Sequence, residues 1–273
     1  RDMKIWIVES DNRNVEALYI DHYEIIEKYI IPNFKGRRID DWEAIKVERA
    51  GRKRKCDVYR FVSGHLVVSE RAVQILQPLM SDKVQILPID YEGTKTLYVL
   101  NVINVVDCLD YEKSKIRRMR DGTVSEIDEF AFDYSKVSQH DIFKIPEKIW
   151  STVFVSDKFK ATVEENGLIG FKFTEVWDSD EKAVQERKRR YQEKLAEIRR
   201  IYGPEYTFDE AIKLLDQGKA FVSDQWKLQK NKKGDIVLGR LVESTCEYLF
   251  LVVVYYPPIL ITYKWKETEP SDV

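Results

Sequence analysis

The chain has 273 residues, of which 44% are hydrophobic and 34% are charged. This composition is typical of a folded globular protein, and the length suffices for one large or two modest domains. The 45 basic and 47 acidic residues give a formal net charge of −2. Such a chain lacks the positive field of proteins that bind nucleic acid or anionic membranes, so we expect neither partner.

The cysteines and the apolar segments bear on whether the protein is secreted, membrane-bound or cytoplasmic. Cys56, Cys108 and Cys246 are odd in number and far apart, without the spacing of a zinc site or a redox motif. The first eight residues contain only four consecutive apolar residues, too few for a secretory leader. The apolar stretch Tyr248–Ile261 contains two prolines and is shorter than the roughly 20 residues of a membrane-spanning helix. We expect a reduced cytoplasmic protein without cofactor or metal, and two buried strands in that stretch.

The first predicted elements are a strand, a helix and a second strand. Lys4–Glu9 has the pattern of a strand, and the apolar residues of Asn14–Ile31 fall near one face of a helix. Trp42–Glu48 alternates as a strand does. The basic run Gly51–Lys55 follows, which predicts a solvated turn or, alternatively, an electrostatic contact to a partner.

A short pattern then occurs twice, as LVVSERAV at Leu66–Val73 and as VFVSDKFK at Val153–Lys160. Each copy has three apolar residues, a serine, an acid and a base. The serine hydroxyl can cap the first free amides of a helix, and a carboxylate in the first turn complements the helix dipole. The residues concerned are Ser69, Glu70, Ser156 and Asp157.

Each copy is expected to continue into a helix and a returning strand. The first helix runs over about Glu70–Met80, and Val84–Ile89 returns as a strand. In the second copy, Asn166-Gly167 supplies a left-handed stop and Ile169–Val176 returns likewise. The sequence therefore predicts two strand–helix–strand units.

Between the two units, Tyr98–Val106 is rich in β-branched residues and predicts a central strand. It ends at Asp107 and Asp110, two acids that could bind a metal or share a proton, or could instead satisfy turn amides. Asp121-Gly122-Thr123 marks a hairpin turn.

After the second unit, a highly charged helix is predicted from Glu181 to about Tyr202, leaning on a surface or bridging two parts of the chain. Thr207–Glu210 is a capping box for a short helix, and three or four strands follow from Lys219. We expect an α+β fold with mainly antiparallel or mixed sheet, the two repeated units, and a C-terminal helix and β-meander. The expected domains are residues 1–180 and a helical connector with a small β-rich domain at 181–273.

The chain shows no catalytic signature. Glycine is scarce, with 11 residues, which disfavours phosphate-wrapping loops. His65 is the best candidate for a general base, and a hydrolase or transferase using His65 with Asp107 or Asp110 stays open as an alternative. Cys108 lies beside acids that would raise its thiol pKa, which is unfavourable for a nucleophile.

Three blocks carry a family resemblance, in the order LVVSERAVQILQPLMSDKVQILPIDYEG, LYVLNVINVVDCLDYEKS and IFKIPEKIWSTVFVSDKFKATVEENGLIGFKFTEVWDSD. Over about residues 35–180 the chain resembles the bacterial polymorphic-toxin immunity protein family eleven, formerly a domain of unknown function. The resemblance implies a non-enzymatic cytoplasmic protein that is encoded beside a toxin and protects the producing cell by stoichiometric binding of that cognate toxin.

The resemblance also assigns family-motif residues with a structural or interface role. These are Ser69, Glu70, Asp107, Asp110, Ser156 and Asp157. Residues 181–273 lie beyond the resembling region. A third possibility is a scaffold that forms a homodimer through the apolar C-terminal strands.

Overall fold

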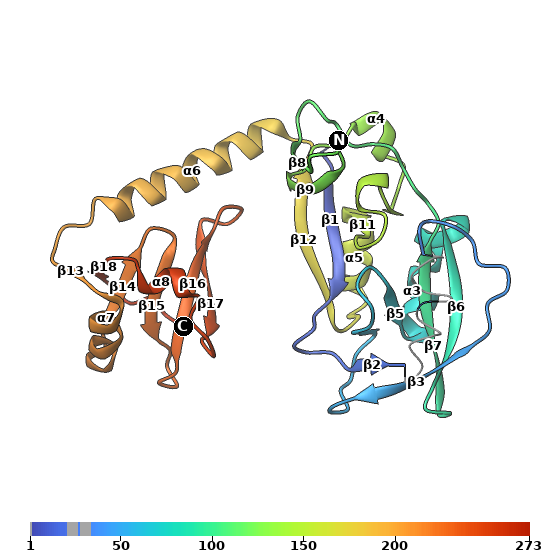
Figure 1. Cartoon of the computed structure of the whole chain (residues 1–273), viewed down its shortest axis with the longest axis horizontal. Coiled ribbons are helices and arrows are strands. Elements are labelled where there is room, and N and C mark those ends of the chain that lie inside the picture. Colours follow the sequence, from blue (N-terminus) through green and yellow to red (C-terminus); the bar gives the residue numbers. More distant parts are fainter. Residues whose placement is uncertain (1, 21–26, 28–33) are drawn as a thin grey trace. The chain divides into compact units, whose positions relative to one another are not determined.

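The computed structural model describes residues 2–20, 27 and 34–273. The chain forms two compact units, residues 1–179 and 180–273 (Figure 1). Helices and mixed or antiparallel sheets alternate through both units, which confirms the predicted α+β class.

Two larger sheets form the N-terminal unit. The first is antiparallel, in the order β10-β11-β1-β12, with strands β1 (Lys4–Ser10), β10 (Ile142–Phe143), β11 (Phe154–Ser156) and β12 (Phe171–Asp178). The second has the order β2-β3-β6-β7-β5-β4, and its β3 and β6 are parallel. Its strands are β2 (Ala17–Tyr19), β3 (Ile45–Ala50), β4 (Val58–Tyr59), β5 (Leu66–Val68), β6 (Val84–Tyr91) and β7 (Lys95–Val102).

The repeated sequence pattern forms two split strand–helix–strand units. Helix α3 (Glu70–Met80) connects β5 to β6, and helix α5 (Asp157–Glu165) connects β11 to β12. In each unit one antiparallel strand lies between the two parallel ones, β7 in the first unit and β1 in the second. The two helices contact each other, so the two copies form one body.

Core residues lie on both faces of the first sheet, and successive residues of β1 point to opposite faces. Val8 joins the larger core, which also contains the buried faces of α3 and α5. Ile5 lies on the other face, where it packs with Phe143 and Phe154. The short helix α4 (Tyr134–Val137) contributes Val137 to this second core.

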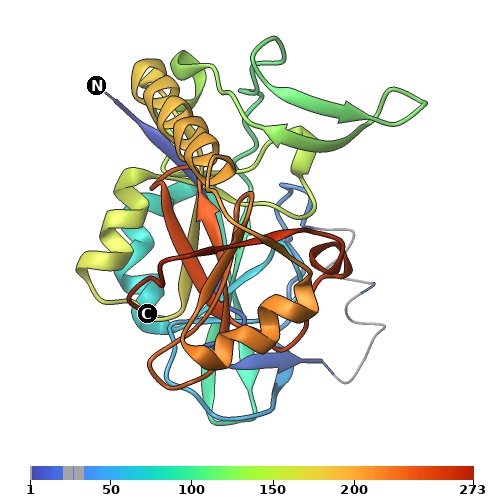
Figure 2. The same cartoon turned by 90° about the vertical axis from the view of Figure 1, so that its left-hand side faces the viewer.

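A separate two-stranded hairpin rises from the second core. It consists of β8 (Lys115–Arg118) and β9 (Val124–Glu129), which pair only with each other within the described residues. We call Lys115–Glu129 the β8–β9 arm. Figure 2 shows it extending from the body of the N-terminal unit.

The C-terminal unit is built on one antiparallel sheet in the order β13-β18-β14-β15-β16-β17. Its strands are β13 (Glu205–Tyr206), β14 (Ala220–Ser223), β15 (Trp226–Lys230), β16 (Ile236–Val242), β17 (Glu247–Val252) and β18 (Trp265–Thr268). Helix α6 (Glu181–Arg199) packs Leu195 and Ile198 against one face, on Val222 and Leu241. Helices α7 (Phe208–Leu214) and α8 (Pro258–Ile261) lie on the other face.

Two N-terminal predictions differ from the structure in their extent. At the start of the helix expected over Asn14–Ile31, Ala17–Tyr19 forms strand β2 and pairs with β3. Most of the remaining segment lies outside the described residues, and its one described position, residue 27, is helical. The strand expected at Tyr98–Val106 is β7, Lys95–Val102. It ends early because the amides of Ile103 and Asn104 turn to the Lys83 carbonyl oxygen, at 3.0 and 3.2 Å.

The prediction of two buried strands in Tyr248–Ile261 is wrong. The segment contains β17, which is an edge strand, and then the helical turn α8, which begins directly after Pro257. Strand β17 pairs with β16 at the margin of the sheet, and several of its apolar side chains are exposed, among them Leu249 at 59%. Five strands follow Lys219 rather than three or four, since β18 returns to pair with β14.

Candidate interaction surfaces

The serine of the first repeat caps α3 as predicted and also bonds to a buried carboxylate. Ser69 Oγ accepts a hydrogen bond from the Ala72 amide at 3.1 Å and donates one to Asp57 Oδ1 at 2.9 Å. The Ser69 amide in turn donates to the Asp57 carbonyl oxygen at 2.9 Å. Glu70 lies exposed in the first turn of the helix.

Asp57 links the first repeat to the second. Its side chain is only 10% exposed, and its Oδ2 accepts from Arg71 Nη1 and from the Ile169 amide, both at 2.9 Å. Arg71 Nη2 also donates to the Asn166 carbonyl oxygen at 2.5 Å. We call Asp57, Ser69 and Arg71 the Asp57 cluster. It fixes the start of α3 to the loop that follows α5.

The second repeat has the same arrangement, the Asp141 cluster of Asp141, Ser156 and Lys158. Ser156 Oγ accepts from the Phe159 amide at 3.2 Å and donates to Asp141 Oδ1 at 2.7 Å. The Ser156 amide donates to the Asp141 carbonyl oxygen at 3.1 Å, and Lys158 Nζ lies 3.7 Å from Asp141 Oδ2. The base two residues after each serine therefore faces the same carboxylate as the serine.

Asp157 fixes strand β1. Its Oδ2 accepts from the Lys4 amide at 2.7 Å, and its Oδ1 accepts from Trp6 Nε1 at 2.9 Å. Because β1 separates β11 from β12, this contact places the N-terminal strand inside the second unit. Ser69, Ser156 and Asp157 therefore make hydrogen bonds that stabilise the fold.

Asp57 and Asp141 were missed by the sequence reasoning. They precede their serines by 12 and 15 residues, so the repeat does not include them. The only shared sequence feature that points toward them is the base at the second position after each serine, Arg71 and Lys158, which in the structure faces the carboxylate.

Two of the three residues of the enzyme alternative, His65 and Asp110, make local structural contacts. His65 Nδ1 lies 2.9 Å from the Ser63 carbonyl oxygen, and its ring packs edge-on against Phe34 with centroids 4.1 Å apart. Asp110 Oδ1 accepts from the amides of Glu112 and Lys113, at 3.1 and 3.2 Å. This is the turn arrangement considered for Asp110 above, while Asp107 lies exposed.

Cys108 lies in the second core of the N-terminal unit. Burial raises its thiol pKa to about 12, and the nearby carboxylates Glu147 and Asp107 add to the increase. A thiol with such a pKa stays protonated near neutral pH and is a poor nucleophile. Among the described residues, no three His, Cys, Asp or Glu side chains gather in a way that could bind a metal ion.

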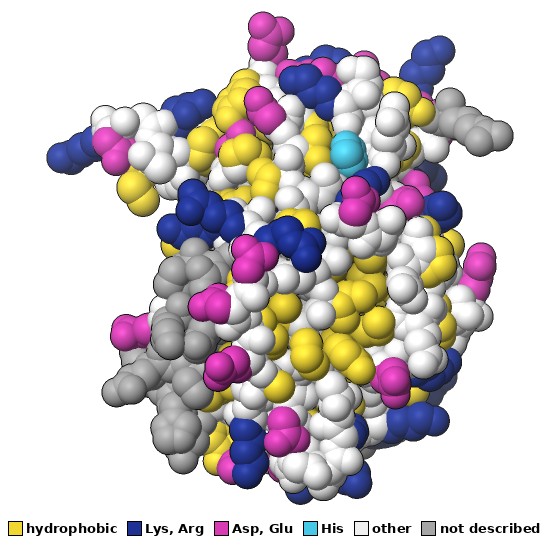
Figure 3. Space-filling view, turned by 90° about the vertical axis from the view of Figure 1, so that its right-hand side faces the viewer, with side chains coloured by type: hydrophobic (Ala, Val, Ile, Leu, Met, Phe, Trp, Pro, Cys, Tyr) yellow, Lys and Arg dark blue, Asp and Glu magenta, His cyan; other side chains and the backbone are white. Residues whose placement is uncertain are grey.

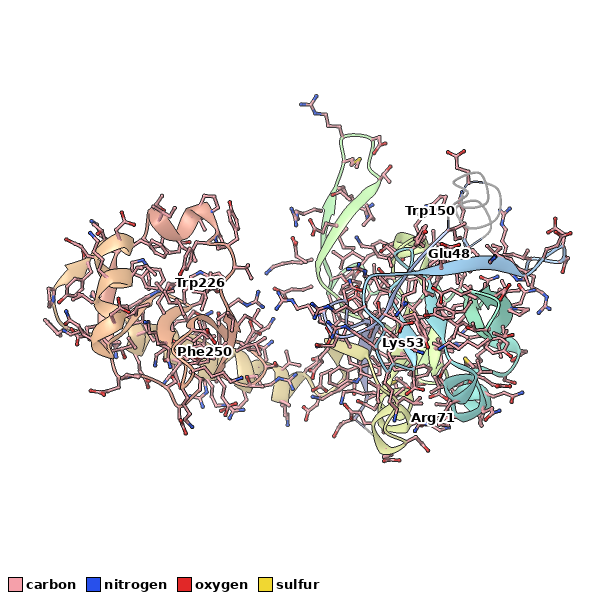
Figure 4. The ribbon with its side chains drawn as sticks, turned by 90° about the horizontal axis from the view of Figure 1, so that it is seen from below. Glu48, Lys53, Arg71, Trp150, Trp226 and Phe250 are labelled. Carbon is pink, nitrogen blue, oxygen red and sulfur yellow. The ribbon has the colours of Figure 1, made fainter. Side chains whose placement is uncertain are left out.

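The exposed surfaces of the N-terminal unit include three groups of side chains suited to binding. Figure 3 shows hydrophobic side chains gathered in the middle of one face, with charged side chains around them. Trp150 is 50% exposed, and Lys35 Nζ lies 3.8 Å from the centroid of its ring. The third group is at the tip of the β8–β9 arm, where Met119 is 59% exposed. Figure 4 shows Trp150 and the projecting arm.

The basic run forms an exposed loop with a buried anchor. Its four cations, at residues 52–55, are exposed and form no ion pair with the residues that the structure describes. Glu16, only 2% exposed, accepts from the Arg54 amide at 2.7 Å and from the Tyr91 hydroxyl at 2.6 Å. Burial raises the Tyr91 pKa, and the bond to Glu16 adds to the increase, so the hydroxyl remains a donor. Figure 4 shows Lys53 on this loop.

The C-terminal unit exposes an apolar edge. The residues concerned are Leu249, Leu251, Val252, Val254, Tyr255, Ile259 and Ile261, each exposed by 46% or more. Helices α7 and α8 cover the part of this face that contains Leu228 and Trp265, and β17 lies at its margin. An apolar edge strand is a site at which other chains can pair.

Comparison with known families identifies the chain. The model of the Immunity protein family (Imm11) matches residues 7–178, which is most of the N-terminal unit and more than half of the chain. The chain therefore belongs to the Imm11 immunity protein family, and the resemblance in the three sequence blocks is confirmed. No curated protein matches the chain. Within the described residues, no helix is long and apolar enough to cross a membrane.

Proposed function

We propose that this protein neutralises a cognate bacterial toxin by forming a stoichiometric complex with it, and that it does so without catalysis. The family match over residues 7–178 is the observation that carries the proposal. The protein acts in the cytoplasm, where it protects the cell that produces the toxin. Its partner is a protein rather than a nucleic acid or a membrane, which agrees with the net charge of −2.

The geometry of the N-terminal unit supports a binding function. The family-motif residues Ser69, Ser156 and Asp157 stabilise the fold, and we assign the same structural role to Asp110, which caps a turn. Asp107 and Glu70 lie exposed and are available to a partner. Apolar and aromatic side chains surrounded by charges have the composition of a protein interface, in which a few desolvated anchors supply most of the affinity.

Coexpression tests the proposal directly. The toxin domain encoded next to this gene is expressed in a sensitive host, alone and with the chain described here. We expect growth only in the presence of the immunity protein, and a one-to-one complex in calorimetry with the purified proteins. The proposal fails if the two proteins do not bind, or if protection persists when binding is abolished.

A second proposal concerns the C-terminal unit. The exposed edge of β17, with Leu249 and Leu251, favours self-association of two chains. Light scattering at increasing protein concentration tests it, and a constant molecular mass of 32.3 kDa would refute it.

A further inference from the structure

The β8–β9 arm is stiffened along its sides by ion pairs. Lys115 Nζ lies 2.6 Å from Glu129 Oε1, and Arg117 Nη2 lies 2.8 Å from Asp128 Oδ1. Arg117 also pairs with Glu126. Each exposed pair is weak alone, and isolated two-stranded hairpins are only marginally stable. A ladder of pairs with opposite charge on opposite strands favours this hairpin register over others.

The two ends of the arm are also fixed. Toward its base, Ile127 is buried in the second core and its cross-strand partner Ile116 packs against that core, as does Val124 further along the arm. At its turn, Gly122 adopts a φ of +85°, and Asp121 Oδ1 accepts from the Thr123 amide at 2.9 Å. This bond lowers the pKa of Asp121. The arm is therefore preorganised although it pairs with no other described strand.

The tip of the arm carries two arginines that form no ion pair with the described residues, and an exposed methionine between them. We define the arm tip as Arg118, Met119 and Arg120. Neither arginine forms an ion pair with the described residues, in contrast to Arg117 below them. Arg118 Nη1 donates to the Gly122 carbonyl oxygen at 2.8 Å, and its Cζ lies 5.6 Å from the centroid of the half-exposed Tyr111 ring. These two contacts orient the Arg118 side chain in the free protein.

These features match the requirements of a binding element. Arg, Met and Tyr are enriched in protein interfaces, and a rigid element loses little conformational entropy when it binds. A projecting tip fits a concave partner surface. Carboxylates on the partner surface would complement the guanidinium groups of Arg118 and Arg120, and an apolar pocket between those carboxylates would complement Met119.

We propose that the β8–β9 arm inserts its tip into a concave, acidic site of the cognate toxin and blocks that site. This inference rests on the proposed function and names the element that performs it. A protein site fits better than a nucleic acid, because Glu126, Asp128 and Glu129 along β9 offset the charges of Lys115 and Arg117, so the unpaired positive charge is confined to the arm tip and offers no extended track for phosphates.

Two arm-tip variants, Arg120→Glu and Met119→Ala, test the proposal in the full chain against the toxin domain encoded beside this gene. Two matched variants are the controls. Lys53→Glu makes the same charge change on the exposed basic loop, and Trp150→Ala removes another exposed apolar side chain. Dissociation constants are measured at low and at moderate salt, and thermal unfolding verifies that each variant is folded.

We expect each arm-tip variant to weaken binding by about 30-fold or more and the controls to change it by less than about 3-fold. Arg120→Glu should also lose most of the salt dependence of the association rate. Unchanged binding by both arm-tip variants refutes the arm as the neutralising element, as does a larger loss in Trp150→Ala. An equal loss in Lys53→Glu indicates general electrostatic attraction and also refutes it.

Trypsin digestion of the unmodified protein gives a second measurement. Cleavage after Arg118 and Arg120, followed by mass spectrometry, should be slower in the complex than in the free protein. Cleavage within the basic loop at residues 52–55 serves as the control. Equal cleavage of the tip in both states refutes insertion. If the wild-type chain does not bind the toxin at all, the proposed function fails, and that result is distinct from failure of the arm.

Discussion

The burial of Lys144 makes the stability of the N-terminal unit depend on pH. Lys144 is 1% exposed, and its Nζ donates to the carbonyl oxygens of Phe34 and Ile149, at 3.2 and 3.1 Å. No carboxylate among the described residues pairs with it. Burial without a counter-charge disfavours the ammonium form and lowers the pKa from 10.5 to about 8.

The magnitude follows from the difference between the folded and unfolded pKa values. With 10.5 in the unfolded chain and about 8 in the folded one, and about 1.36 kcal/mol per pH unit, the ammonium form costs the fold about 3 kcal/mol. Between these pKa values the unfolded chain binds the proton and the folded chain does not. The free energy of unfolding therefore rises as the pH increases from about 8 to 10.5 and is lower by this amount below pH 8.

The variant Lys144→Met isolates this contribution. It removes the ammonium but leaves the two carbonyl oxygens without their donor, at a cost of about 1–3 kcal/mol. At pH 7 we expect the variant and the parent to have about the same free energy of unfolding. Between pH 8 and pH 10.5 the parent gains about 3 kcal/mol and the variant does not, so the variant is then the less stable protein by about that amount. Urea unfolding followed by tryptophan fluorescence, at several pH values, gives the difference between the two proteins. Parallel stability curves across this range would refute the reasoning.

Three further predictions concern single substitutions. Asp57→Ala removes the acceptor of Ser69, Arg71 and the Ile169 amide and should lower the free energy of unfolding by about 3 kcal/mol in urea titrations, because three partly buried hydrogen bonds to one carboxylate are lost together. Ser156→Ala removes the cap of α5 and should cost about 1 kcal/mol in the same assay. Leu251→Lys places a charge on the exposed edge and should reduce self-association in light scattering without changing the thermal unfolding temperature.

The controls for these substitutions use matched side chains. Asp110→Ala removes a carboxylate whose hydrogen bonds within the described residues come from two turn amides, so it should lower the free energy of unfolding clearly less than Asp57→Ala does. Equal effects would contradict the role of the Asp57 cluster. Thr174→Lys, on an exposed strand position of the N-terminal unit, is the control for Leu251→Lys. A similar change of association in both would contradict the assignment to β17.

Local signals predicted the helix starts correctly. Ser69, Ser156 and Thr207 each accept a bond from an amide three residues ahead, so their effect depends only on neighbouring residues. The hairpin turn at Gly122 and the stop at Gly167 are likewise local, since both glycines adopt positive φ values. The motif serines of the candidate site were therefore found, while their acidic partners were not.

The sequence by itself determined the α+β class, the two strand–helix–strand repeats and the family, because these depend on patterns within short segments. Only the tertiary structure decided that β7 and β1 lie inside the two repeats, that Asp57 and Asp141 bond to the capping serines, and that the apolar C-terminal segment lies at an open edge. Each of these depends on which distant residues become neighbours. Hydrophobicity sets how strongly a side chain avoids water, but the position of its strand in the sheet decides whether it is covered.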